Sequence, residues 1–178
     1  MQKFKVLVLT DHTNHSAENS LYVMLQRMRE HPRCAKIDIV TRANAANDFF
    51  FQKYTAEGLE VSPVGEDFGF SPEGKSFQQQ RRKENLEAYD VAWLRLPPPI
   101  PKSFLIFLKH KFPNIIFVND PDGIYQTGSK AFLSNFADVC APMKLCRSLD
   151  DILNFSAQFP IVLKPLRDYG GKGIIKIE

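Results

Sequence analysis

The chain has 178 residues, of which 44% are hydrophobic and 12% aromatic, enough for a packed core in one large domain or in one domain and part of another. Its net charge of +3 and its one basic cluster, residues 81–83 followed at once by Glu84, argue against nucleic-acid binding, which needs basic charge gathered on one face. Three cysteines without C-x-x-C spacing argue against a disulfide framework or a zinc site. No apolar run has the length of a membrane span. We therefore expect a soluble, cytoplasmic protein with no membrane partner.

Residues 4–40 follow a β-α-β pattern, which predicts the start of an open α/β sheet. Residues 4–9 and 37–40 are mostly apolar and rich in β-branched side chains, which is typical of strands buried on both faces of a parallel sheet. Apolar residues recur at helical spacing between these strands, and we expect Ser16 to cap the helix.

The polar loop of residues 11–20 follows the first strand. Open α/β sheets bind ligands beyond the carboxyl ends of their strands, so the polar side chains of this loop are candidates for a substrate site. His12 and His15 are either metal ligands or ordinary loop histidines, and the lack of a nearby cluster of His, Cys or acidic residues favours the second interpretation.

Residues 42–88 contain many turn-forming residues, so their secondary structure is harder to predict than that of residues 4–40. A short strand is expected at residues 59–64. The polar stretch of residues 65–76 has the composition of a mobile loop, and residues 78–88 are rich in good helix formers.

Residues 90–96 predict a strand, which the prolines of residues 97–101 must end. Arg95 lies just before the carboxyl end of this strand. Either its guanidinium reaches the solvent along the surface, or it points into the cleft to hold a carboxylate with two parallel hydrogen bonds, and strand polarity favours the cleft. A helix at 103–111 and a buried strand at 115–118 complete an α/β layer of at least four strands.

The turn-forming residues 119–124 predict a domain boundary. Residues 123–130 nearly match a P-loop, but the Ser and Lys stand in the wrong order for that motif, so we reject it. Thr127 or Ser129 is expected to cap the next helix, and Ser148 begins another.

The last stretch predicts two strands, residues 161–163 and 174–177, joined by a loop with three glycines. Glycine lets backbone N–H groups approach an anion closely, and Lys164 ends the first strand where its ammonium could meet phosphates. The alternative is a plain β-hairpin in which the glycines only turn the chain.

Several segments, in this order and spacing, resemble the ATP-grasp ligases and most closely the bacterial glutathione synthetases: residues 90–99, 119–121, 130–133, 148–151 and 163–174. The resemblance covers the whole chain but only the front part of such an enzyme. It implies an α/β pre-ATP-grasp substrate domain at 1–119, Rossmann-like, with an open, mostly parallel sheet and flanking helices. It implies an incomplete α+β ATP-grasp subdomain at 120–178.

The resemblance also implies two sets of site residues. Nucleotide phosphates would be held by Lys130 and Lys164 and covered by a loop with Gly170, Gly171 and Gly173. The peptide substrate would contact Asn19, Ser20 and Arg95. One departure is that Arg167 and Asp168 stand where the family often has Asp-Gly, which puts the mobility of the loop and the acceptor specificity in question.

By the same resemblance, the reaction joins a carboxylate to an amine through an acyl phosphate, with ATP and Mg²⁺ as cofactors and γ-glutamylcysteine and glycine as substrates. The catalytic residues and metal ligands are expected beyond Glu178, with no metal ligand in this chain. We therefore expect the N-terminal part of a longer enzyme, inactive alone, whose exposed strand edges favour a homo-oligomer. The alternatives are another ATP-grasp ligase, such as a ribosomal-protein glutamate ligase, or a non-catalytic module that binds a small ligand.

Overall fold

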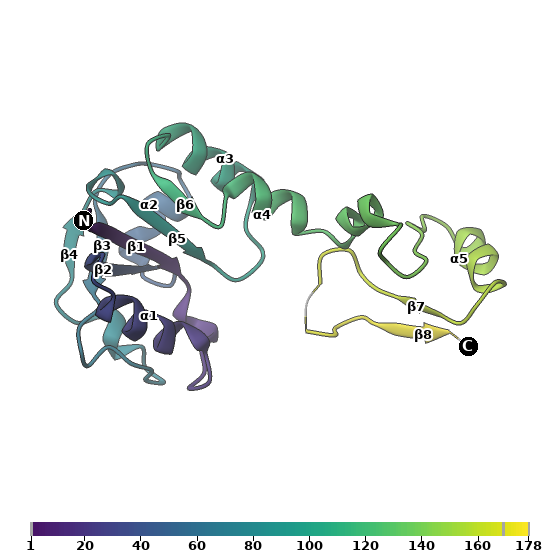
Figure 1. The fold of residues 1–178 in the computed structure, drawn as a ribbon, viewed down its shortest axis with the longest axis horizontal. Coiled ribbons are helices and arrows are strands. Elements are labelled where there is room, and N and C mark those ends of the chain that lie inside the picture. The colour runs from purple at the N-terminus through teal and green to yellow at the C-terminus, as the bar shows by residue number, and fades with distance from the viewer. Residues whose placement is uncertain (1, 169, 178) are drawn as a thin grey trace. The chain divides into compact units, whose positions relative to one another are not determined.

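The computed structural model describes residues 2–168 and 170–177 (Figure 1). The chain divides into two compact units, Met1–Pro121 and Asp122–Glu178. The assignment of these units to a pre-ATP-grasp domain and an ATP-grasp subdomain stays a prediction.

The first unit is built on a six-stranded sheet with the order β4-β3-β2-β1-β5-β6. Strands β2, β1, β5 and β6 run parallel, whereas β3 and β4 are added antiparallel at one edge. This confirms the predicted α/β class with a mostly parallel sheet. The strands are β1 (Phe4–Thr10), β2 (Cys34–Thr41), β3 (Leu59–Pro63), β4 (Arg82–Glu84), β5 (Val91–Arg95) and β6 (Ile116–Val118).

Three α-helices flank this sheet: α1 (Ser20–Glu30), α2 (Asp48–Phe51) and α3 (Lys102–Lys111). The prediction that Ser16 caps the first helix was wrong. The cap is Asn19, whose side-chain oxygen accepts a hydrogen bond from the backbone N–H of Leu21. Short 3₁₀ turns lie at His12–Asn14, Ala45–Asn47, Lys75–Phe77 and Leu86–Ala88.

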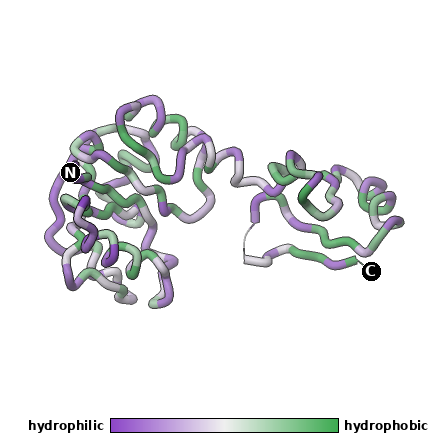
Figure 2. The backbone as a smooth tube through the Cα atoms, in the orientation of Figure 1, coloured by the Kyte–Doolittle hydropathy of each residue, from purple (hydrophilic) through white to green (hydrophobic). Residues whose placement is uncertain are grey.

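The core forms on both faces of the central strand β1, whose Leu7, Val8 and Leu9 are fully buried. Alternation along the strand sends Val8 toward the face covered by α1, where it packs with Leu25. Helices α2 and α3 lie on the other face (Figure 1), and hydrophobic residues gather along the strands between the helical layers (Figure 2). Phe50 of α2 packs there with Phe104 and Phe107 of α3. Residues 6–9 of β1 are therefore all hydrophobic, as expected for a parallel strand covered on both sides, whereas the edge strand β4 is Arg-Lys-Glu.

Strand β6 was predicted as buried, but it is the edge strand of the sheet. Ile116 is 56% exposed and Val118 is 42% exposed. An apolar sequence alone does not distinguish an edge strand from a central one, because the difference lies in what covers it.

The helix predicted at residues 78–88 was also wrong, because this segment contains β4. The carboxylate of Asp38 is 1% exposed and accepts hydrogen bonds from the guanidinium of Arg82 and the hydroxyl of Tyr89. Arg82 also pairs with Glu84 at 3.1 Å, and Lys36 pairs with Asp38 at 3.1 Å. A buried carboxylate needs such partners, and this requirement outweighs the small helix preference of the segment.

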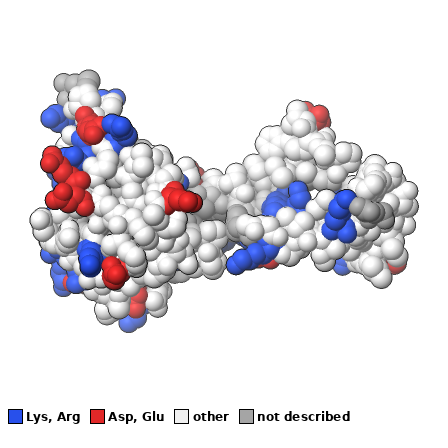
Figure 3. Space-filling model, turned by 90° about the horizontal axis from the view of Figure 1, so that it is seen from below, with Lys and Arg blue, Asp and Glu red and all other residues white. Residues whose placement is uncertain are grey.

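The stretch predicted as a mobile loop, residues 65–76, is instead packed onto the rest of the first unit. Gln26 donates side-chain hydrogen bonds to the carbonyl oxygens of Gly65, Glu66 and Phe68. The Phe68 side chain is buried in the core, and the hydroxyl of Ser76 closes the loop onto the carbonyl of Gly69 at 2.8 Å. On the face shown in Figure 3, acidic and basic side chains are interspersed over this unit.

The described residues of the second unit form two α-helices, a 3₁₀ helix and a β-hairpin. Helix α4 (Pro121–Thr127) begins within the predicted turn, because proline is well tolerated at a first helical position. The 3₁₀ helix Lys130–Phe136 is capped by Ser129, and α5 (Leu149–Ser156) is capped by Ser148, as predicted. The hairpin pairs β7 (Ile161–Leu163) with β8 (Ile175–Ile177).

Burial is sparse in the second unit. Among its described residues, Ile161 is the one buried hydrophobic side chain. The three cysteines of the chain, Cys34, Cys140 and Cys146, are free thiols. None of the helices in the described part of the chain is both long and apolar enough to cross a membrane.

Candidate functional site

Three strands of the first unit end side by side. In the sheet register, Thr10 of β1 lies opposite Thr41 of β2 on one side and Arg95 of β5 on the other. Parallel strands present their carboxyl ends at one edge, so the residues that follow them, including Asp11 and Arg42, gather there. This edge holds the substrate-site residues expected from the sequence.

The two histidines of the 11–20 loop bind hydroxyl groups. His12 Nδ1 lies 2.8 Å from Thr41 Oγ1, and His12 stacks on the ring of Phe77 with 4.6 Å between ring centroids. His15 lies between two hydroxyls, with Nε2 3.2 Å from Thr10 Oγ1 and Nδ1 2.9 Å from the oxygen of Tyr22. Burial lowers the pKa of both histidines. They are therefore neutral hydrogen-bonding groups that attach the loop to the sheet.

Asp11 and Arg42 form an ion pair at the same edge, with 2.9 Å between Asp11 Oδ2 and Arg42 Nε. Burial opposes ionisation of Asp11, but hydrogen bonds from Thr13 and Arg42 outweigh it and lower the pKa of this carboxyl. Asp11 is thus a carboxylate near neutral pH, and it holds the Arg42 guanidinium beside the strand ends.

The structure brings Arg95 and Ser20 together. The Arg95 side chain is exposed, and its Nη2 donates to Ser20 Oγ at 3.3 Å. Its guanidinium carbon lies 5.4 Å from the ring centroid of Trp93. Asn19 lies next to Ser20, but its side-chain oxygen already caps α1. The role of these three residues in substrate binding stays a prediction.

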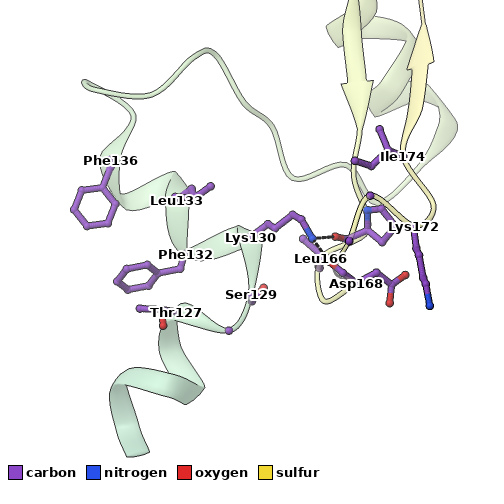
Figure 4. Close-up of a pocket in the computed structure, with 14 residues that line it drawn as sticks. Thr127, Ser129, Lys130, Phe132, Leu133, Phe136, Leu166, Asp168, Lys172 and Ile174 are labelled. Carbon is purple, nitrogen blue, oxygen red and sulfur yellow. Dashed lines mark hydrogen bonds between the residues drawn. The ribbon is translucent and has the colours of Figure 1, made fainter. Parts of the chain in front are cut away.

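The second unit contains a pocket of about 510 Å³ (Figure 4). It includes three of the five predicted nucleotide-binding residues: Lys130, Gly170 and Gly171. Lys164 is exposed and does not line this pocket, and neither does Gly173. The other lining residues are Thr127, Gly128, Ser129, Phe132, Leu133, Phe136, Pro165, Leu166, Asp168, Lys172 and Ile174.

Lys130 connects the 3₁₀ helix to the loop after β7. Its ammonium donates to the carbonyl oxygens of Pro165 at 2.7 Å and Asp168 at 2.6 Å (Figure 4). Its backbone N–H also donates to the carbonyl of Leu166 at 3.0 Å. The cation is thus fixed at the pocket wall by oxygen atoms, which are the kind of partner that a phosphate could replace.

The glycines of the hairpin loop adopt left-handed backbone conformations, with φ of 66° at Gly170 and 76° at Gly171. A side chain at either position would meet open space, so it is the backbone angle that favours glycine there. Gly173 has φ of 67° and also lacks room, because a Cβ would lie 2.8 Å from Cγ of Pro165. The loop therefore offers an exposed, unobstructed backbone to the pocket.

Sequence reasoning missed two parts of these sites. The apolar wall of the pocket, formed by Phe132, Phe136 and Ile174, was expected only as helix and strand packing. Arg42 was missed because its partners lie far away in the chain. The available signal was its position directly after a strand, which matches that of Asp11 after β1.

Comparison with known proteins gives a partial match. Glutathione synthetase from Bradyrhizobium diazoefficiens is 31% identical over 100 residues, which are 54% of this chain and 32% of that protein. Glutathione synthetase from Agrobacterium fabrum is 27% identical over 125 residues, or 67% of this chain and 37% of that protein. Glutathione synthetase from Anaplasma centrale is 31% identical over 91 residues, which are 49% of this chain and 29% of that protein. No family model matches.

The matched region spans about a third of the length of these curated relatives. The resemblance stated from the motifs is confirmed at this level, since the chain contains a partial, glutathione synthetase-like region.

Proposed function

We propose that this chain is the front part of an ATP-dependent carboxylate–amine ligase of the glutathione synthetase type. The observation that carries the proposal is the pocket in which Lys130 lies beside Gly170 and Gly171, in a chain that is similar to glutathione synthetases over about half of its length. The first unit would contribute the substrate platform, and the second would contribute part of the nucleotide site.

The pocket residues suit a nucleotide. The ammonium of Lys130 would exchange its bonds to the carbonyls of Pro165 and Asp168 for bonds to phosphate oxygens. The backbone of Gly170 and Gly171 can approach an anion without a Cβ in the way. The apolar wall, which includes Phe132, suits the flat face of a base.

Lys164 and Gly173 would contribute from outside the pocket wall. Lys164 ends β7 and is exposed, so it would reach the phosphates only with a movement of the loop. Gly173 would let the loop pass close to Pro165. Lys130 is therefore proposed as the principal phosphate ligand of this chain, and Lys164 as a secondary one.

A bound Mg²⁺ would supply the stabilisation of negative charge that phosphoryl transfer requires. Among the described residues, no group of three or more His, Cys, Asp or Glu side chains is arranged to hold a metal ion.

At the strand ends of the first unit, Arg95 and Ser20 would bind the carboxylate substrate, γ-glutamylcysteine, with Asn19 fixing the start of α1 beside them. In the reaction, a carboxylate oxygen of the substrate takes the γ-phosphoryl group of ATP, and ADP leaves. The amine of glycine then forms the amide bond as phosphate leaves. Positioning and charge stabilisation by the protein are what such transfers require.

The test is phosphate release from MgATP by the complete protein. We expect release only when γ-glutamylcysteine and glycine are both present. Release with other amino acids in place of glycine, or with other peptides, would instead identify a different ATP-grasp ligase. Ligand binding without any phosphate release would identify the non-catalytic module.

A further inference from the structure

Arg42 joins three separate segments at the carboxyl edge of the sheet. It directly follows β2, and its Nε donates to Asp11 Oδ2 at 2.9 Å. Its Nη1 donates to the carbonyl of Pro99 at 3.2 Å, and its Nη2 lies 3.4 Å from the carbonyl of Pro97. The Arg42 side chain is only 27% exposed. One guanidinium therefore holds the chain after β1 and the chain after β5 in place.

The segment that Arg42 binds, residues 97–99, cannot donate backbone hydrogen bonds of its own. Prolines have no backbone N–H, so residues 97–99 cannot extend the sheet and can only accept hydrogen bonds. Before this segment, the carbonyl of Arg95 accepts a hydrogen bond from Thr10 Oγ1 at 3.2 Å. The backbone of Arg95 is thus fixed from one side by Thr10, and the chain just after it is fixed by Arg42.

We propose that Arg42 is a positioning residue, which sets the direction of the Arg95 guanidinium by fixing the proline segment that follows it. The part of this inference that concerns substrate binding rests on the proposed function. Arg42 does not need to touch the substrate. It acts on Arg95 through the backbone of residues 97–99.

The fork of the guanidinium separates this role from that of a simple ion pair. A lysine at position 42 could still pair with Asp11, but its single ammonium could not also reach two carbonyls in fixed directions. Arg42→Lys therefore keeps the charge and removes the connection to the proline segment. Asp11→Asn does the reverse, since it weakens the pair and leaves the carbonyl contacts.

The single tryptophan of the chain reports on Arg95 directly. Trp93 is buried, and the Arg95 guanidinium carbon lies 5.4 Å from its ring centroid, so removal of the cation changes the surroundings of the indole. We expect Arg42→Lys to change the Trp93 emission in the same direction as Arg95→Ala. The double variant Arg42→Lys/Arg95→Ala should show no change in emission beyond that of Arg95→Ala. Asp11→Asn should change the emission less than Arg42→Lys.

Arg27→Lys is the matched control, because Arg27 forms an exposed pair with Glu30 on α1 and should leave the emission unchanged. Circular dichroism establishes that each variant is folded. Wild-type emission from a folded Arg42→Lys protein would overturn the proposal. So would an additive change in the double variant. If Arg42→Lys does not fold, Asp11→Asn decides: an emission change as large as that of Arg95→Ala would assign the positioning to the ion pair and overturn the proposal, whereas a small change supports it.

Kinetics of the complete protein separate this inference from the proposed function. A displaced Arg95 should raise the KM for the carboxylate substrate by about tenfold in Arg42→Lys, with a smaller change in kcat. If Arg95→Ala leaves that KM unchanged, the proposed substrate role of Arg95 fails, while the emission experiment still decides whether Arg42 positions it.

Discussion

The two units of this chain differ in how they are stabilised. The first unit has a core around β1, in which the side chains of Leu7, Val8 and Leu25 are fully buried. The second unit has one buried hydrophobic side chain among its described residues, and apolar residues such as Val139 and Leu149 are 77% and 68% exposed. Hydrophobic burial therefore contributes more to the stability of the first unit than to that of the described part of the second.

This difference fits a division of labour. The strand ends of the first unit are fixed by cross-connections such as Arg42 to Asp11, which suits a rigid substrate platform. The hairpin loop of the second unit is attached by Lys130 through two hydrogen bonds, which the proposed nucleotide would replace. Regions with few buried contacts are those that open and close most easily.

The largest expected effect tests the comparison with one substitution in each unit. Leu25→Ala on α1 should destabilise the first unit by about 3 to 4 kcal/mol, because it leaves a cavity in a closed core. Leu149→Ala on α5 is the matched control and should change the free energy of unfolding by less than about 0.5 kcal/mol. Urea unfolding followed by Trp93 emission and circular dichroism measures both. Equal losses would contradict the comparison.

A second prediction concerns the buried carboxylate of Asp38, which binds Arg82 of β4. Asp38→Ala should cost about 3 kcal/mol, because Arg82 and Tyr89 lose the partner that they share. Burial and the nearby Asp38 raise the pKa of Tyr89, so its hydroxyl stays a donor that needs an acceptor. Thermal and urea unfolding measure the loss. As a control, Glu73→Ala removes an exposed pair with Lys75 and should change little.

The smallest expected effect is the pH dependence of the first unit. The pKa of His12 and of His15 is lowered by burial, so the unfolded chain binds protons more readily than the folded chain. The stability is therefore fully present above about pH 6.5, the usual pKa of histidine, and falls as the pH drops below that value. Melting temperatures from pH 8 to pH 5 measure the slope. Replacing both histidines with Gln should flatten it, and an unchanged slope would contradict this explanation.

The parts of the fold that depend on local pattern were predictable. The strands near residues 4–9 and 37–40 follow from their β-branched apolar residues. Ser148 is typical of a helix N-cap, and α5 begins directly after it. The strand β4 could not be predicted, because its reason is the buried carboxylate of Asp38, which lies 44 positions from Arg82 in the chain. Long-range polar partners leave no periodic signal in a sequence.

The candidate site divides in the same way. Lys130 and the glycines were expected from motifs, and the structure places Lys130 with Gly170 and Gly171 in one pocket. Lys164 was expected to bind the same phosphates, but it does not line this pocket. The role of Arg42 depends on carbonyls that no side-chain motif records.

The most direct test of the account is the affinity of the complete protein for ATP, measured by displacement of a fluorescent nucleotide. Lys130→Met should weaken binding by about tenfold to a hundredfold, since it removes a charged hydrogen-bond donor from the proposed phosphate site. Lys83→Met, which removes an exposed lysine of the first unit, is the control and should bind as the wild type does. Wild-type affinity in folded Lys130→Met would contradict the assignment of the pocket as a nucleotide site.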